Sequence, residues 1–376
     1  DVNIDTSSRN KAAVSVTGSG NTTIKLDGDN ALKSDSSRSG IYGSGSLTIT
    51  GGENDSLTAQ GGSGENGGDG ISSKDLTISG GTVTATGGNS TGIAGSGGSG
   101  IHSGGDVTIS GGTVTATGGD STGSDGSGGY GIYSSRTTTI SGGTVTATGG
   151  DSTSSVGSGG SGIYSVSGDV TISGGTVNAN GGDGKNGSDG GDGISSDSLT
   201  ISGGTVTTKG GSGDDGGSGV LIYSNGSLTV SGGTVTANGG SGSYRGGSGI
   251  SSSDIELSGS LELTAKAGSP NGKALSQNGI ELDPNTFKEK LDPGANIITK
   301  DADGKVINQV SSPRPVEPEG PVIPEESSSS SDSGSSTPSA DGGSATPSAP
   351  ASPLPGLTVT DKDGQRISYT SIRGNN

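Results

Sequence analysis

The segment Leu76-Thr-Ile-Ser-Gly-Gly-Thr-Val-Thr-Ala-Thr-Gly-Gly88 decides the fold, because close copies of it recur along the chain. Its first Gly-Gly pair begins at residues 51, 80, 111, 142, 174, 203 and 232, at intervals of 29, 31, 31, 32, 29 and 29 residues. A second marker, Gly-Ile or a close variant, begins at residues 40, 70, 100, 131, 162, 193, 219 and 249. A fixed period of this size predicts a solenoid, in which each unit buries its apolar residues only against its neighbours.

Within one unit, residues 75–79 and 82–86 alternate between apolar and polar side chains. This period of two is typical of strands with one buried and one solvated face. With a further strand near Ile71, each unit is predicted to hold three short strands. The glycine pairs between them supply the positive φ angles or bulges that a tight corner needs. The predicted fold class is therefore all-β, a right-handed parallel β-helix with coils of about 30 residues.

Stacked coils place like residues over like at a spacing of about 4.8 Å. Three inward-facing ladders then form a thin core, which suits a chain with few aliphatic residues. The first ladder contains Ile49, Ile78, Ile109, Ile140, Ile172, Ile201 and Val230. The second contains Val83, Val114, Val145, Val177, Val206 and Val235, and the third contains Ala85, Ala116, Ala147, Ala179 and Ala237.

Composition excludes several classes of protein. The formal net charge is -18 and the few basic residues are scattered, so nucleic acid and an anionic membrane surface would be repelled. The sequence has no apolar run near the roughly 20 residues that span a bilayer, so direct membrane insertion is not expected. Glycine accounts for 82 of the 376 residues, but the absence of a Gly-X-Y period excludes collagen.

The chain divides into five predicted regions. Residues 1–39 form an opening coil and N-terminal cap, 40–273 the repeat β-helix, and 274–310 a C-terminal cap region. In that cap, Asp283 and Pro284 begin a helical turn whose Phe287 plugs the open end of the core. Residues 311–355 are rich in Pro, Ser and acidic residues and are predicted to be a disordered linker, while 356–376 begin a further segment.

An outward-facing file of rings is the strongest candidate for a binding site. The position after the strand-opening aliphatic residue holds Tyr42, Ser72, His102, Tyr133, Tyr164, Ser195, Tyr223 and Ser251. Flat amphipathic rings suit the apolar faces of sugars, so Tyr42, His102, Tyr133, Tyr164 and Tyr223 are the predicted ligand-binding residues. The alternative is that tyrosine merely pairs well across strands on a half-solvated face. His102 has no Ser–Asp partner at a suggestive spacing, so no catalytic residue is predicted.

A set of acidic residues is the candidate metal site. Asp120, Asp151 and Asp183 share the position after the second glycine pair with Asn89. Stacked carboxylates repel one another unless a cation lies between them, and oxygen ligands suit Ca²⁺. We therefore expect Ca²⁺ as a possible cofactor; the alternative is that these residues serve local turn chemistry.

Two further hypotheses concern the outer surface. Threonine pairs such as Thr82 and Thr84 recur in a flat array that resembles an ice-binding face, although Asn178 and Asn180 interrupt it. A polysaccharide lyase would need basic residues clustered near acids in a groove, and the sequence indicates no such cluster.

The phrases Leu-Thr-Ile-Ser-Gly-Gly-Thr-Val-Thr-Ala-Thr-Gly-Gly and Gly-Gly-Asp-Gly-Ile-Ser-Ser resemble the Gly-rich repeats of surface proteins from Gram-positive bacteria. Over residues 14–273 the chain is similar to the carbohydrate-binding, polysaccharide-lyase-like β-helix family. The resemblance implies a parallel β-helix that is extracellular or at the cell surface and binds a plant or host polysaccharide, with Ca²⁺ in some members. The predicted function is non-enzymatic carbohydrate binding or adhesion; the alternatives are a passive stalk, an ice-binding solenoid and a degenerate lyase. Neither the glycan nor the oligomeric state follows from the sequence.

Overall fold

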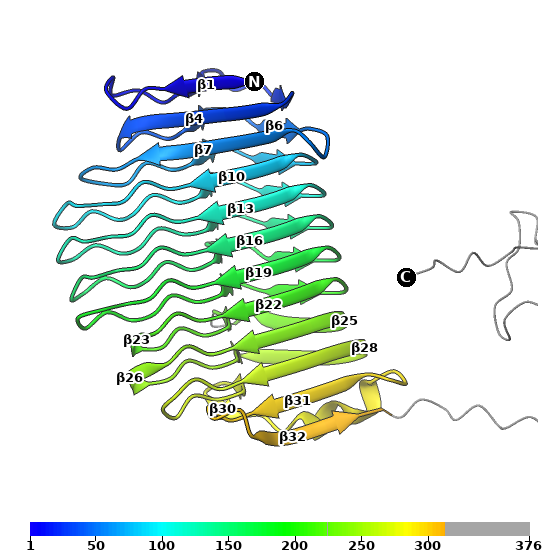
Figure 1. Ribbon diagram of the computed structural model, residues 1–376. Coiled ribbons are helices and arrows are strands. Elements are labelled where there is room, and N and C mark those ends of the chain that lie inside the picture. The colour runs from blue at the N-terminus through cyan, green and yellow to red at the C-terminus, as the bar shows by residue number, and fades with distance from the viewer. Residues whose placement is uncertain (224, 313–376) are drawn as a thin grey trace, which may run out of the picture. The chain divides into compact units, whose positions relative to one another are not determined.

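The computed structural model describes residues 1–223 and 225–312, which form a parallel β-helix of about nine turns (Figure 1). A typical turn contains three short strands, β8 (Ile71–Ser73), β9 (Leu76–Ile78) and β10 (Thr82–Thr86). Each pairs in parallel with its counterpart in the next turn. The predicted fold class and the three-strand coil are therefore confirmed. Residues 313–355 of the predicted linker (311–355) and the predicted segment 356–376 lie outside the described residues.

The turns build two long sheets. Sheet B has 11 strands: β2 (Val14–Val16), β5 (Ile41–Gly43), β8, β11 (Ile101–Ser103), β14 (Ile132–Ser134), β17 (Ile163–Ser165), β20 (Ile194–Ser196), β24 (Val220–Ile222), β27 (Ile250–Ser252), β29 (Leu275–Gln277) and β30 (Ile280–Glu281). Sheet A has 19 strands in two rows. One row contains β3 (Thr22–Lys25), β6 (Leu47–Thr50), β9, β12 (Val107–Ile109), β15 (Thr138–Ile140), β18 (Val170–Ile172) and β21 (Leu199–Ile201).

The other row of sheet A contains β1 (Val2–Asp5), β4 (Asp29–Ser36), β7 (Ser56–Gly62), β10, β13 (Thr113–Thr117), β16 (Thr144–Thr148), β19 (Thr176–Asn180) and β22 (Thr205–Lys209). The two rows merge in the long strands β25 (Ser227–Asn238) and β28 (Asp254–Lys266), which are followed by β31 (Asn296–Lys300) and β32 (Val306–Ser311). A small separate sheet joins β23 (Gly213–Asp215) to β26 (Gly242–Arg245).

The corner between the two rows of sheet A depends on glycine. From the pair at residues 80–81 onward, the second residue of these Gly-Gly pairs has a positive φ, for example 80° at Gly81 and Gly112. The same conformation recurs with φ from 78° to 84° at Gly143, Gly175, Gly204 and Gly233. Residues with a Cβ rarely adopt this backbone region, so the recurrent pair is required by the turn.

The core has the predicted ladders. Ile109, Val145 and Ala147 are fully buried, and their ladders run in register through the repeat. The alanine ladder has one substitution, since Thr208 lies between Ala179 and Ala237. The Thr208 hydroxyl is buried and has no hydrogen-bond partner within the described residues. A buried polar group without a partner destabilises a fold, so this position is a local defect in the core.

The third side of the solenoid is a glycine arm, which we define as the loop between the third strand of a turn and the next Gly-Ile marker. In the arm of residues 87–99, the Gly98 amide donates to the Gly88 carbonyl at 2.9 Å, and the Gly119 amide of the next turn donates to the Gly98 carbonyl at 2.8 Å. The zigzag continues from turn to turn as far as Gly268. A Cβ on Gly119 would lie 2.0 Å from the Gly88 carbonyl oxygen, so the close packing of these backbones accounts for much of the glycine content.

The C-terminal end of the β-helix is closed by non-repeat elements. Strand β31 pairs in parallel with β28, and β32 pairs with β31 in the antiparallel direction. The N-cap of the 3-10 helix η1 (Pro284–Lys290) is Asp283, whose side chain accepts a hydrogen bond from the Asn285 amide. Phe287 from this helix is only 7% exposed and joins the core cluster, as predicted. At the other end, β1 adds a strand to β4 that the sequence analysis did not predict.

Candidate functional site

The outer face of sheet B carries the predicted file of rings. His102, Tyr133 and Tyr164 occupy the same register position on β11, β14 and β17, each between a buried isoleucine and a buried serine. The ring centroids of His102 and Tyr133 lie 4.6 Å apart, and those of Tyr133 and Tyr164 lie 5.8 Å apart. All three side chains are half-buried. The alternation of residues in the repeat therefore predicted the register of these three rings correctly, and their role in ligand binding stays a prediction.

Tyr130 completes the ring cluster and was missed by the sequence analysis. It precedes the Gly131-Ile132 marker, where other turns carry Asp or Ser, as at Asp69 and Ser99. Its ring lies 4.6 Å from that of Tyr164 at an interplanar angle of 6°, and 5.5 Å from that of Tyr133. Burial raises the pKa of Tyr130 to about 12, so its phenol is neutral at physiological pH. The only signal in the sequence was the unusual residue type at this loop position.

Tyr223 is on the same face but not in the predicted register position. Leu221 pairs with Ser195 on one side and with Ser251 on the other, so Leu221 occupies the place assigned to Tyr223. Tyr223 lies two residues further along and presents its ring edge-on to Tyr164, with centroids 6.3 Å apart. Its hydroxyl accepts a hydrogen bond from the Ser195 hydroxyl at 2.9 Å. Burial raises the Tyr223 pKa.

Tyr42 is in the predicted register but stands apart from the other rings. Ser72 separates it from His102 in the file. The Tyr42 side chain is 45% exposed and lines a groove at the N-terminal end of sheet B. The predicted binding residues therefore fall into two parts. Four of them, His102, Tyr133, Tyr164 and Tyr223, form a cluster together with Tyr130, and the fifth, Tyr42, lies apart beside the groove.

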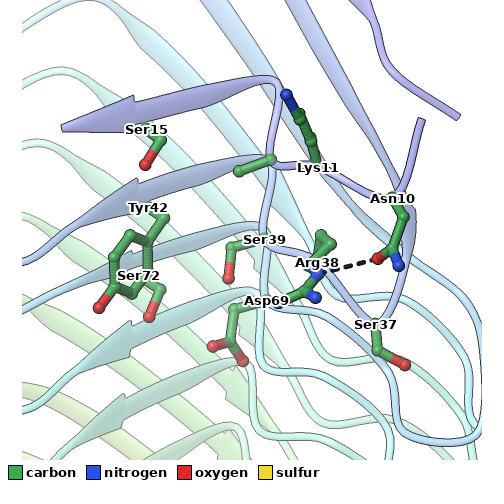
Figure 2. Close-up of a pocket in the computed structure, with 10 residues that line it drawn as sticks. Asn10, Lys11, Ser15, Ser37, Arg38, Ser39, Tyr42, Asp69 and Ser72 are labelled. Carbon is green, nitrogen blue, oxygen red and sulfur yellow. Dashed lines mark hydrogen bonds between the residues drawn. The ribbon is translucent and has the colours of Figure 1, made fainter. Parts of the chain in front are cut away.

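The groove has a volume of about 560 Å³ and is lined by residues from the first three turns, including Asn10, Lys11, Arg38, Asp69 and Ser72 (Figure 2). The Arg38 Nε donates to Asn10 Oδ1 at 3.0 Å. The sequence analysis indicated no basic residues clustered beside an acid in a groove, and this is wrong here. Lys11 and Arg38 lie in non-repeat segments, so the repeat pattern gave no indication that they share a groove with Asp69.

His102 connects the groove to the rings. Its Nδ1 lies 3.2 Å from Asp69 Oδ2, while Asp69 Oδ1 accepts the Ser99 amide at 2.9 Å. The hydrogen bond to Asp69 raises the pKa of His102 above its usual 6.5. Asp69 of the preceding turn therefore provides an acidic partner for His102 that the sequence analysis did not identify. Within the described residues, however, His102 makes no hydrogen bond to a hydroxyl group that could act as a nucleophile.

A second acid borders the other end of the ring cluster. Asp192 is half-buried and its Oδ1 accepts the Ser218 amide at 2.7 Å. Burial raises the pKa of Asp192 to about 7, and its charge raises the pKa of the nearby phenols Tyr130 and Tyr223. The two acids that precede Gly-Ile markers, Asp69 and Asp192, thus lie at opposite ends of the rings.

The side chains of the predicted calcium ligands form a ladder in which each accepts a hydrogen bond from a backbone amide of the next turn. Asn89 Oδ1 accepts the Asp120 amide, Asp120 Oδ1 the Asp151 amide, and Asp151 Oδ1 the Asp183 amide, each at 2.9 Å. Lys185 also lies 3.0 Å from Asp151 Oδ2. In the described part of the chain, no group of three or more His, Asp or Glu side chains is arranged to hold a metal ion. One carboxylate oxygen of Asp120, Asp151 and Asp183 thus accepts a backbone amide of the following turn. Ca²⁺ binding by these residues stays a prediction.

The threonine array on sheet A is in register. The exposed positions Thr82, Thr113, Thr144, Thr176, Thr205 and Thr234 pair successively along six turns. Asn178 interrupts the neighbouring file between Thr146 and Thr207, as the sequence indicated.

The stacked parallel turns define a parallel β-helix. Four segments match the family model described as a beta helix repeat, namely residues 107–132, 139–162, 170–194 and 199–219. No curated protein and no solved structure matches the chain. The described residues contain no helix with the length and apolar character needed to cross a membrane.

Proposed function

We propose that this β-helix is a non-enzymatic carbohydrate-binding or adhesive module that acts outside the cell or at the cell surface. The observation that carries the proposal is the cluster of half-buried rings around Tyr133 and Tyr164 on sheet B. Elsewhere, the outward positions of the repeat are mostly occupied by serine and threonine. Flat rings with a polar edge can pack on the apolar face of a sugar and bond its hydroxyl groups at the rim.

The geometry favours an extended polysaccharide. Consecutive rings come from consecutive turns, and turns are spaced by about 4.8 Å along the solenoid axis. The file therefore offers repeated contacts in one direction rather than a single enclosed pocket. A long ligand gains from such repetition, because each further contact is made within a complex that has already formed.

Retardation in gels that contain a neutral polysaccharide tests this proposal. Fully methyl-esterified pectin and galactomannan are suitable probes. The variant with Tyr133→Ser and Tyr164→Ser should lose most of its retardation with an unchanged circular dichroism spectrum, because Ser72 and Ser195 already occupy these positions in other turns. The matched control changes Thr115→Ser and Thr146→Ser on sheet A. Equal retardation of the ring variant and the control would contradict the proposal, and an unretarded wild-type protein would favour a passive stalk.

Ice binding is a second candidate, favoured by the register of the threonine file over six turns. A flat array of this kind on a rigid sheet could order water at regular intervals. Thermal hysteresis of the wild-type protein that disappears on Thr113→Tyr and Thr144→Tyr substitution would support this candidate. Freezing behaviour equal to that of an inert protein at the same concentration would exclude it.

A further inference from the structure

We propose that the groove beside Tyr42 is a subsite for a negatively charged sugar residue of the bound polysaccharide. The inference rests on the proposed function and adds a substrate class to it. It is carried by Lys11 and Arg38, which line the groove although the chain as a whole has a net charge of -18. Figure 2 shows Tyr42 on one side of the groove and Arg38 with Asn10 on the other.

Both cations are available for a ligand. The six ion pairs within the described residues include neither Lys11 nor Arg38. Arg38 uses its Nε for the contact with Asn10, and its two terminal nitrogens make no hydrogen bond within the described residues. A guanidinium binds a carboxylate or a sulfate through two parallel hydrogen bonds, and this geometry is stronger and more selective than a point charge.

The two carboxylates near the groove already accept hydrogen bonds from other groups of the protein. Asp69 accepts hydrogen bonds from the Ser99 amide and from His102 Nδ1. Asp35 accepts the backbone amides of Asn10 and Ser36. The oxygens of both carboxylates are thus already bound by donors of the protein, whereas Lys11 and Arg38 have no ion-pair partner within the described residues.

The groove continues the ring file. Ser72 and Asp69 line the groove, while Ser72 pairs with His102 in register and Asp69 contacts the His102 ring. A chain that lies along the solenoid axis over Tyr164, Tyr133 and His102 therefore reaches Arg38 at its far end. The sugar over Tyr42 can pack on that ring while its charged group contacts Arg38 and Lys11.

Retardation in gels that contain polygalacturonate or methyl-esterified pectin at about 0.15 M salt tests the subsite, because long-range charge effects are then largely screened. The groove variant carries Lys11→Gln and Arg38→Gln. Its control carries Lys266→Gln and Lys300→Gln, which remove a neighbouring pair of lysines at the C-terminal end of sheet A. The groove variant should bind polygalacturonate about tenfold more weakly than the control does, since charge-assisted hydrogen bonds are lost. Its binding to the methyl-esterified form should not change.

A third gel, containing dextran sulfate, identifies the anion. Retardation that depends on Lys11 and Arg38 in this gel but not in polygalacturonate would assign the subsite to a sulfated sugar, and the reverse would assign it to a uronate. Equal weakening by the control pair, or no weakening in either acidic gel, would overturn the inference. A wild-type protein that is retarded in the neutral gel through Tyr133 and Tyr164, and no more strongly in the acidic gels, would overturn the subsite and leave the proposed function standing. No retardation in any gel would overturn both.

Discussion

The ring of Tyr130 lies parallel to that of Tyr164, at 4.6 Å and 6°, although the two residues belong to different turns and only Tyr164 is on a strand. A loop residue of one turn is thereby packed on the strand residue of the next. The Tyr130 ring also contacts the Tyr133 ring, so it packs against two neighbouring rings of the file. The cluster is held by contacts in two directions, along the axis and from the adjacent loop.

Replacing Tyr130 with Ser should weaken polysaccharide binding without unfolding the protein. Ser99 and Ser161 occupy the equivalent position in the neighbouring turns, so the backbone accepts serine there. The lost stacking contacts, worth about 0.5–1.5 kcal/mol per ring pair, should leave Tyr133 and Tyr164 more mobile. Gel retardation with methyl-esterified pectin measures the effect on binding. Unchanged retardation would mean that Tyr130 has no part in the site.

The register of the core is tested by Val145→Asp and its neighbour Thr146→Asp. Val145 is fully buried in the middle of an inner ladder, while Thr146 faces outward on the same strand. The first change buries a charge without a partner and should cost about 3–5 kcal/mol. The second should stay within about 0.5 kcal/mol, as is usual for a surface position. Urea unfolding curves compare the two, and equal losses would contradict the register.

Thr208→Val should stabilise the protein, although it is a change in the core. The Thr208 hydroxyl lacks a partner within the described residues, and removing an unsatisfied buried group is worth about 1–3 kcal/mol. Thr138 is the matched control, because its buried hydroxyl lies 2.8 Å from the Ser134 hydroxyl and 3.2 Å from that of Ser165. Thr138→Val should therefore destabilise by about 1 kcal/mol. Thermal melting of the two variants should shift in opposite directions; a shift in the same direction would refute the distinction.

The pair of His102 and Asp69 should contribute a pH-dependent part of the stability. The pKa of His102 in the folded state is raised above its usual 6.5, so the folded state binds the proton more tightly than the unfolded chain does. The resulting stability is fully present below pH 6.5 and is lost as the pH rises through the raised pKa. His102→Gln should therefore lower the melting temperature at about pH 5.5 and by less at about pH 8.5.

The size of this effect is limited by exposure, since the His102 side chain is 40% exposed. We expect no more than about 1 kcal/mol, the range of partly exposed ion pairs. Asp69→Asn provides the second arm of a double-mutant cycle. Additive effects of the two substitutions, or a loss that grows with pH, would show that the pair does not act as described.

Calcium should raise the melting temperature if the aspartate ladder binds it, because a ligand of the folded state alone stabilises that state. Changing Asp120, Asp151 and Asp183 to Asn preserves the amide-accepting oxygens and removes three charges, so this variant should fold but lose the calcium effect. Differential scanning calorimetry at millimolar Ca²⁺ measures the shift. No shift in the wild-type protein would leave these residues with their turn role alone.

The repeat made most of the fold predictable. Because the same residues recur at the same place in each turn, the period alone identified the buried ladders and the outward register of His102, Tyr133 and Tyr164. Tyr223 was misplaced because Val220 and Ile222 both face inward, so alternation did not reveal which of them opens the strand. The real position follows from pairing with the neighbouring turns, which places Leu221 in the file.

The rest of the site could not be predicted from periodicity, because it depends on residues that occur only once. Asn10, Lys11 and Arg38 lie in the opening turns, where the repeat has not begun. Tyr130 lies in a loop, where alternation says nothing about orientation. Asp69 lies in the loop of one turn and contacts His102 on the strand of the next. This contact depends on how the turns stack, and no sequence motif marks it.

The zigzag of hydrogen bonds through the glycine arms has a consequence for how such a molecule can change in length. Each arm presents the same donors and acceptors to the turn above and to the turn below, so a complete turn can be removed or inserted with every ladder rejoined to a partner of its own kind. The ring face would then grow or shrink in steps of about 4.8 Å. The number of repeats therefore sets the length of the outer surface of sheet B. The chemistry of that surface at each turn is set separately, by the single outward residue that the turn contributes.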